Sequence, residues 1–121
     1  MDFGTGLMGN LFAEIPANLP DELIQTLFGT SNLRIERIVS KGHCSPDDFW
    51  YDQADDEWVL LLQGEARVGF ADGESVTLKS GDYWLIKAHC LHRVEWTTDA
   101  IETVWLAVHF KAVNQETLLD S

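Results

Sequence analysis

Apolar and polar residues alternate over short segments along most of the chain after residue 31. This alternation predicts eight strands, over residues 33–39, 49–53, 57–63, 65–70, 74–78, 83–86, 91–96 and 102–110. Asp72-Gly73 is a dipeptide typical of a two-residue hairpin loop, and Gly64 and Gly81 mark further turns. Short strands joined by tight turns, with no helix between them, predict an all-β fold, an antiparallel sandwich or barrel.

The segment PDELIQTLF at residues 20–28 has a different pattern. Pro20 suits the first position of a helix, the acidic residues after it favour the helix N-terminus, and Gly29 suits the helix end. Its apolar residues lie on one stripe, so we expect a short helix that covers an apolar face of the barrel. The chain is therefore divided into an N-terminal extension with this helix (1–31), a β-barrel (32–112) and a C-terminal tail (113–121).

The predicted strand 57–63 is apolar on both faces. Alternation places Glu57 and every second residue after it toward the barrel interior, which leaves Trp58, Leu60 and Leu62 on the outer face. A strand that is apolar on both faces needs cover on both sides. We expect the N-terminal helix to cover one outer patch and a second copy of the chain to cover another, giving a homodimer. The alternative is that the helix and the termini cover the whole outer surface.

Size, charge and cysteine content narrow the class of protein. A chain of 121 residues suits one domain, and its net charge of −12 repels phosphate backbones, so no nucleic-acid partner is expected. No segment approaches the roughly 18 to 20 consecutive apolar residues of a membrane-spanning helix, and the N-terminus lacks the pattern of a secretory signal. Without an export signal, Cys44 and Cys90 are expected to be reduced thiols, and we expect a cytoplasmic protein with no membrane partner.

Two spacings resemble the motifs of the cupin superfamily. The family's first motif begins with Gly, five residues and His-x-His, and continues with three or four residues, Glu, six residues and a final Gly. Glu57 and Gly64 match the last two fixed positions of this motif. The second motif is Gly, five residues, Pro-x-Gly, two residues, His, three residues and Asn, and Gly81 and His92 match it in spacing. The resemblance covers about residues 33–110. It implies a small single-domain cupin with an antiparallel β-barrel of the jelly-roll or double-stranded β-helix type.

The first motif is degenerate, because its His-x-His pair is absent. With a three-residue gap before the glutamate, Tyr51 and Gln53 stand in the places of the two histidines; with a four-residue gap, Trp50 and Asp52 stand there. The second motif departs as well. Its proline, second glycine and asparagine are replaced by Lys87, His89 and Trp96.

The resemblance implies a divalent metal ion, such as Zn, Fe, Mn or Ni, because cupins usually hold a metal with three histidines and a glutamate. Here the implied ligands are Glu57, His92 and Gln53. A tightly held transition metal is usually bound by three or more strong ligands, so this set predicts a weak site. The alternative is that Glu57 and His92 are hydrogen-bonded to each other. A histidine beside a carboxylate in an apolar cup can also work as an acid–base pair without metal.

The aromatic residues suggest a pocket for a small molecule. Trp50 and Tyr51 are expected at the barrel mouth, Trp96 follows His92 by four residues on the same strand, and His109 lies near the barrel rim. An aromatic cup with a few polar groups is typical of a small-molecule site. Two of the other tryptophans, Trp58 and Trp105, are assigned to packing or to an interface.

Three functions fit these observations. The first is a small-molecule-binding cupin that holds a divalent metal weakly or not at all. The second is a metal-dependent enzyme of the dioxygenase, isomerase or decarboxylase type. The third is a non-catalytic structural or regulatory dimer whose barrel is filled with side chains. The sequence favours the first and identifies neither the ligand nor a reaction.

Overall fold

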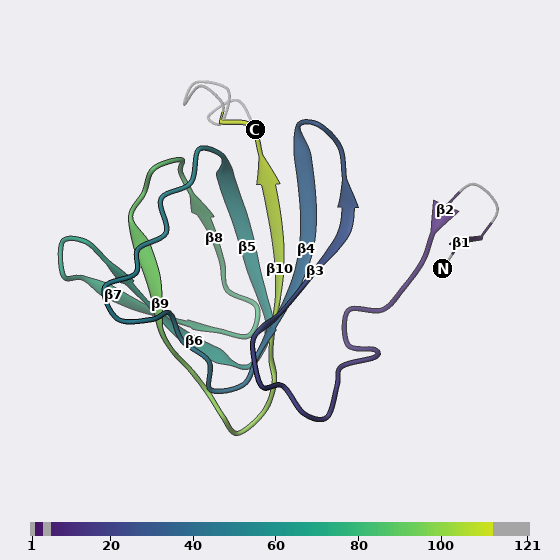
Figure 1. Ribbon diagram of the computed structural model, residues 1–121, viewed down its shortest axis with the longest axis horizontal. Helices are drawn as coiled ribbons and strands as arrows, with labels where there is room; N and C mark the ends of the chain where they lie inside the picture. The colour runs from purple at the N-terminus through teal and green to yellow at the C-terminus, as the bar shows by residue number, and fades with distance from the viewer. Residues whose placement is uncertain (1, 4–5, 113–121) are drawn as a thin grey trace.

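The computed structural model describes residues 2–3 and 6–112, so the predicted C-terminal tail, 113–121, lies outside the described residues. The described residues form ten β-strands and no helix (Figure 1). The strands are β1 (Asp2–Phe3), β2 (Gly6–Leu7), β3 (Leu23–Gly29), β4 (Leu33–Ser40), β5 (Asp56–Gln63), β6 (Glu65–Phe70), β7 (Ser75–Lys79), β8 (Tyr83–Ile86), β9 (His92–Thr97) and β10 (Thr103–Phe110). No helix that could cross a membrane occurs in this part of the chain.

The strands form two facing sheets, and all their pairings are antiparallel. One sheet has five strands in the order β3-β4-β10-β5-β8, and the other has three in the order β7-β6-β9 (Figure 1). β1 and β2 pair only with each other. The prediction of an all-β antiparallel fold is therefore confirmed.

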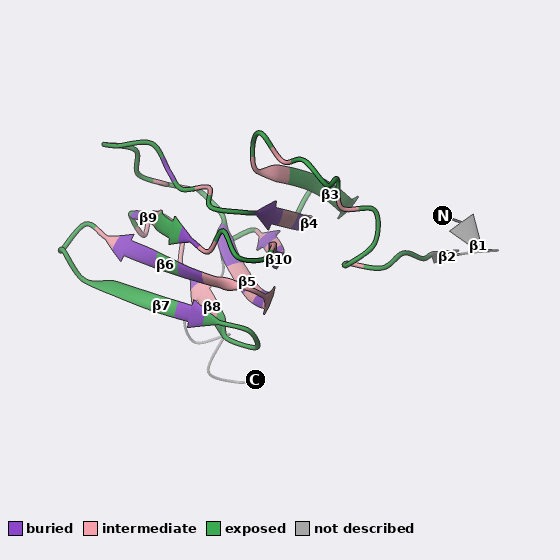
Figure 2. Cartoon of the chain, turned by 90° about the horizontal axis from the view of Figure 1, so that it is seen from below, coloured by how far each residue is buried: buried purple, intermediate pink, exposed green. Residues whose placement is uncertain are grey.

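The core lies between the two sheets. Glu57, Val59 and Leu61 of β5 are buried, whereas Trp58 and Leu60 between them are only partly buried. This confirms the alternation predicted for the strand. Figure 2 shows buried residues concentrated on the central strands, while β3 and β7 at the sheet edges are largely exposed.

The helix predicted over residues 20–28 is wrong, because residues 23–29 form strand β3. β3 pairs antiparallel with β4, from Leu23 opposite Val39 to Gly29 opposite Arg34. An isolated helix of nine residues is marginal in water, whereas the same residues in a strand gain a ladder of hydrogen bonds with the otherwise open edge of β4. β3 thus adds a strand to the sheet instead of covering its face.

An irregular segment before β3 covers part of the outer face of the sheet. Its anchor is Arg37 of β4, whose side chain is only 5 % exposed. The guanidinium donates to the carbonyl oxygens of Leu11 and Ala13, at 3.1 and 2.6 Å, and to the side-chain oxygen of Gln25. The N-terminal extension therefore packs on the sheet through backbone carbonyls gathered around one buried cation.

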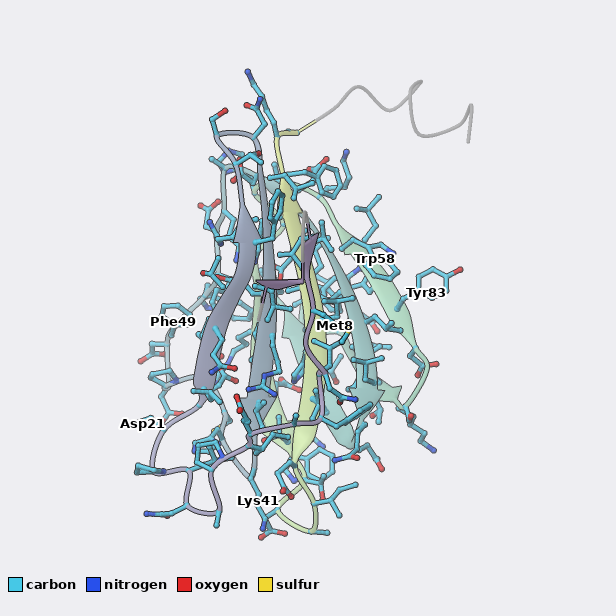
Figure 3. All side chains as sticks on the ribbon, turned by 90° about the vertical axis from the view of Figure 1, so that its right-hand side faces the viewer. Met8, Asp21, Lys41, Phe49, Trp58 and Tyr83 are labelled. Carbon is cyan, nitrogen blue, oxygen red and sulfur yellow. The ribbon has the colours of Figure 1, made fainter. Side chains whose placement is uncertain are left out.

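The rest of the outer face is covered only in part. Trp58 of β5 lies beside Tyr83 of β8, with 5.9 Å between their ring centroids, and both point away from the core (Figure 3). Leu60 and Leu62 of the same row are half-buried. The apolar outer face of β5 that the sequence predicts is therefore present.

Candidate functional site

A cavity of about 270 Å³ lies between the two sheets. Its walls are apolar and aromatic, with Tyr51, Trp84 and Trp105 among the lining residues. Polar side chains line it as well. They are Glu22, Arg34, Glu36, Tyr51, Gln53, Glu57, His92 and His109. This combination of apolar walls with a few convergent polar groups is typical of a binding site for a small molecule.

One wall of the cavity is a row of charged side chains across three neighbouring strands. His109 of β10 stands opposite Glu57 of β5 in the strand register, and Glu36 comes from β4 on the other side. The Nε2 atom of His109 lies 3.0 Å from Oε1 of Glu36 and 3.8 Å from Oε2 of Glu57. A carboxylate accepts hydrogen bonds, so Nε2 of His109 carries a proton. The imidazole therefore stands between two carboxylates.

His92 reaches the same cavity from the opposite sheet. It is 6 % exposed, and its Nδ1 atom lies 2.8 Å from the carbonyl oxygen of Cys90. The carbonyl can only accept, so Nδ1 carries the hydrogen and the neutral ring presents Nε2 as an acceptor. The ring stacks on Tyr51, with 5.2 Å between centroids, and meets Trp84 edge-on. Backbone hydrogen bonds between Tyr51 and His92 fix this arrangement.

The loop that leads to His92 is held without the proline and glycine of the cupin motif. The buried carboxylate of Asp56 accepts from Nζ of Lys87, at 3.0 Å, and from the backbone N–H of Ala88, at 2.8 Å. His89 stands in the place of the second glycine with a φ of 62°, a left-handed conformation that histidine tolerates better than most residues. Its backbone N–H donates to the carbonyl oxygen of Gln53 at 2.8 Å. This loop thereby ties His92 to the segment that carries Gln53.

Burial raises the pKa of Glu57 above its ordinary value. Charge interactions with His109 and then His92 lower the pKa of Glu57, Glu36 raises it further, and a hydrogen bond with Gln53 lowers it. The pKa of Tyr51 is also raised, first by burial and then by the charges of Glu22 and Glu57. The carboxyl group of Glu57 therefore holds its proton to a higher pH than a glutamate in water, which suits a group that exchanges protons.

The structure brings together five of the residues that the sequence singled out. Tyr51, Gln53, Glu57, His92 and His109 all line the cavity. The placement of Tyr51 and Gln53 selects the three-residue gap of the first motif over the four-residue gap. Residues that the sequence singled out therefore lie on both sides of the cavity, on β5 and at the start of β9.

Trp50 and Trp96 do not line the cavity, and their side chains are 39 % and 38 % exposed. The expected inward position of Trp96 fails because β9 contains a bulge. Val94 pairs with Val68 but Trp96 pairs with Arg67, so one extra residue reverses the alternation after Val94. Trp96 then faces outward.

Sequence reasoning missed Glu36, Arg34, Trp84 and Trp105 as lining residues. A signal for the two charged residues exists in LRIERIVS, where Arg34 and Glu36 alternate with apolar neighbours on a central strand. Trp105, assigned to packing or to an interface, is buried and lines the cavity. Trp105 alternates regularly along β10 with Ala107 and His109, which are buried on the same face, but the alternation alone does not say which face of the strand points inward.

The residues at the cupin metal positions do not fit a tightly held transition metal. These positions carry one imidazole (His92), one carboxylate (Glu57), one amide (Gln53) and one phenol (Tyr51). Among the residues that the structure describes, no group of three or more His, Cys, Asp or Glu side chains is placed to hold a metal ion. Amides and protonated phenols are weak ligands beside imidazole and thiolate.

Comparisons with known proteins agree with the fold. The family model described as a cupin domain matches residues 37–109, so the chain belongs to the cupin family. A search of curated protein sequences found no match. A crystal structure from Ralstonia eutropha JMP134, of a protein provisionally described as a mannose-6-phosphate isomerase, is 45 % identical with a TM-score of 0.84. The match covers 88 % of this chain and 100 % of that one.

Two more distant structures share the fold alone. A cupin superfamily protein from Desulfitobacterium hafniense DCB-2 is 21 % identical, with a TM-score of 0.66, over 80 % of this chain and 84 % of that one. A conserved protein of unknown function from Streptococcus pyogenes is 20 % identical, with a TM-score of 0.69, over 94 % and 93 % of the two chains. The chain is thus a small cupin with a degenerate first motif.

Proposed function

We propose that this cupin binds a small organic molecule in the cavity between its sheets and that binding does not require a tightly held metal. The observation that carries the proposal is the cavity itself, with Glu57 and His92 facing each other across aromatic walls. A barrel that serves only as a structural element would be filled by its own side chains. The poor set of metal ligands argues against the metal-dependent enzyme, although a weakly held divalent metal at Glu57, His92 and Gln53 would still be compatible with binding.

Proton-transfer catalysis, such as an isomerisation, is a second candidate. It is favoured by the raised pKa of Glu57 beside His92 and His109, and by the description of the Ralstonia eutropha protein as a mannose-6-phosphate isomerase. A sugar phosphate fits the cavity poorly, because a phosphate needs positive charge. Among the described residues that line the cavity, only Arg34 has a permanent positive charge, and it is already paired with Glu36 at 2.9 Å.

A screen for ligands with a matched pair of variants tests the binding proposal. Val68 lines the cavity, whereas Val76 is an exposed residue of the neighbouring strand β7. We expect some small polar aromatic compounds to raise the melting temperature of the wild type and of Val76→Phe, but not of Val68→Phe, whose ring occupies the cavity. Thermal-shift measurements at millimolar compound concentration give these melting temperatures. Circular dichroism checks that each variant is folded. Equal shifts in both variants, or no shift with any compound, would contradict the proposal.

We also propose that two copies of the chain associate along β3. β3 lies at the edge of the five-stranded sheet, and its Ile24, Leu27 and Phe28 are all exposed. An exposed apolar edge strand is prone to pair with another strand. Pairing with the β3 of a second copy would satisfy both edges at once, in a closed twofold dimer.

Light scattering tests this association. We expect a mass of twice 13.7 kDa at micromolar concentration for the wild type, and a monomer for Leu27→Lys, because a lysine blocks an edge strand. Val76→Lys places the same charge on β7, the edge strand of the other sheet, and should leave the dimer intact. A monomeric wild type, or a monomer with both variants, would rule out pairing through β3.

A further inference from the structure

The charges around the cavity indicate what kind of molecule it accepts. Three lining residues carry carboxylates, Glu22, Glu36 and Glu57, against one guanidinium, that of Arg34. Glu22 is held in place by the buried hydroxyl of Ser40, which donates to its Oε2 at 2.6 Å. Glu36 is paired with Arg34 at 2.9 Å and with His109 at 3.0 Å, and His109 is 3.8 Å from Glu57. The one guanidinium therefore leaves an excess of carboxylates in the cavity, which favours a ligand that brings positive charge.

An acceptor that is reached from the same cavity points to the same kind of ligand. Nδ1 of His92 donates to the carbonyl oxygen of Cys90, so its Nε2 accepts when the ring is neutral. His92 is 6 % exposed and lines the cavity, and Nε2 is not among the fully buried atoms that lack a partner in the described residues. A ligand in the cavity can therefore supply an N–H or O–H donor to it.

The aromatic walls complete the environment of a cation. Tyr51, Trp84 and Trp105 line the cavity, and positive charge is attracted to the faces of such rings, most strongly to tryptophan. Phosphates and carboxylates are repelled by the same carboxylates that attract a cation.

We propose that the ligand of this cavity is an organic cation, a primary ammonium group on an apolar body, whose N–H groups donate to Glu57 and His92 while the body packs against Trp84 and Trp105. This inference rests on the proposed binding function and narrows it to one class of ligand. A primary ammonium has three donors and no acceptor, which matches an end of the cavity that offers mainly acceptors. The volume of about 270 Å³ is at the small end of ligand pockets, so the body of the ligand is small.

Three probes of one shape test the inference: benzylamine (a cation), benzyl alcohol (neutral) and benzoate (an anion). Calorimetry and tryptophan fluorescence at pH 7.5 should show that the amine binds at least about tenfold more tightly than the alcohol, because a hydrogen bond to a charged group contributes that much. Benzoate should bind most weakly. Glu57→Gln should remove most of the preference for the amine over the alcohol. Glu74→Gln, the same change at an exposed position, should leave all three affinities unchanged.

The outcomes distinguish the inference of a cationic ligand from the proposal that the cavity binds a small molecule. If benzyl alcohol binds as tightly as benzylamine, the cation inference is wrong and small-molecule binding stands. If none of the three probes binds, the cation inference is also wrong, and the compound screen with Val68→Phe decides separately whether the cavity binds anything.

Discussion

Replacing Gly64 with alanine should destabilise the protein by about 3 kcal/mol and lower its melting temperature by roughly 10 °C. Gly64 forms the turn between β5 and β6 with a φ of 95°, a left-handed conformation that costs a residue with a Cβ atom about 1 to 2 kcal/mol. A Cβ atom there would also lie 2.6 Å from Cα of Thr103, which belongs to the backbone of β10 and cannot turn away. Overpacking of this kind costs about 1 to 3 kcal/mol more.

Gly73→Ala is the matched control. Gly73 has a φ of 92°, almost the same as Gly64, but no atom lies within 4 Å of the position of its Cβ. The alanine there should lower the free energy of unfolding by the conformational cost alone, about 1 to 2 kcal/mol. Urea denaturation of both variants measures the difference. Equal losses would show that the close approach of Thr103 contributes nothing. Gly64 matches the last glycine of the first cupin motif. The close approach of Thr103 to residue 64 is therefore a physical reason for a glycine at that position of the motif.

Restoring the missing imidazoles should convert the cavity into a metal site. In the double variant Tyr51→His/Gln53→His, two imidazoles would join His92 and Glu57, which gives four strong ligands around one end of the cavity. We expect close to one zinc ion per chain and an affinity at least about a hundredfold higher than that of the wild type. Elemental analysis of protein purified without a metal-affinity tag, followed by calorimetry with zinc, gives both numbers.

Adding His92→Ala to the double variant provides the control for this experiment. It removes one imidazole, so most of the gain in affinity should disappear. Two results would overturn the reasoning. Near-stoichiometric metal in the wild type would mean that Tyr51 and Gln53 are no obstacle to metal binding. No gain in the double variant would mean that positions 51 and 53 do not converge on His92 and Glu57.

The sequence predicts the fold and the inward positions of Glu57 and His92 because these depend on local alternation and on fixed spacing. The alternation of β5 directs Glu57 into the core, and the spacing from Gly81 brings His92 to the same cavity. Residues 20–28 were misassigned because their stop signals and apolar stripe fit a helix. What decided their structure was the open edge of β4, a tertiary feature that a window of nine residues does not contain.

The direction of Trp96 could not be predicted for a related reason. It depends on an irregularity in the pairing of β9 with β6, where one extra residue reverses the side chains beyond it. Trp105 follows the regular alternation of β10, and the sequence alone does not say which face of that strand points inward. Glu36 was missed because a glutamate in an alternating strand is usually assigned to the solvent. Its partner, His109, is 73 positions away in the sequence and becomes its neighbour only when β4 and β10 pair.

The anchoring of the N-terminal segment by Arg37 makes that segment part of the cooperative unit of the sheet. If residues 11–13 detach, the guanidinium of Arg37 loses two carbonyl acceptors while it remains on the inner strand β4. Only the side-chain oxygen of Gln25 would then accept from the guanidinium, so local opening of the segment weakens the packing on β4, and β4 carries Glu36 into the cavity wall. An irregular stretch on the outside of the barrel thereby contributes to the order of the ligand cavity on the inside.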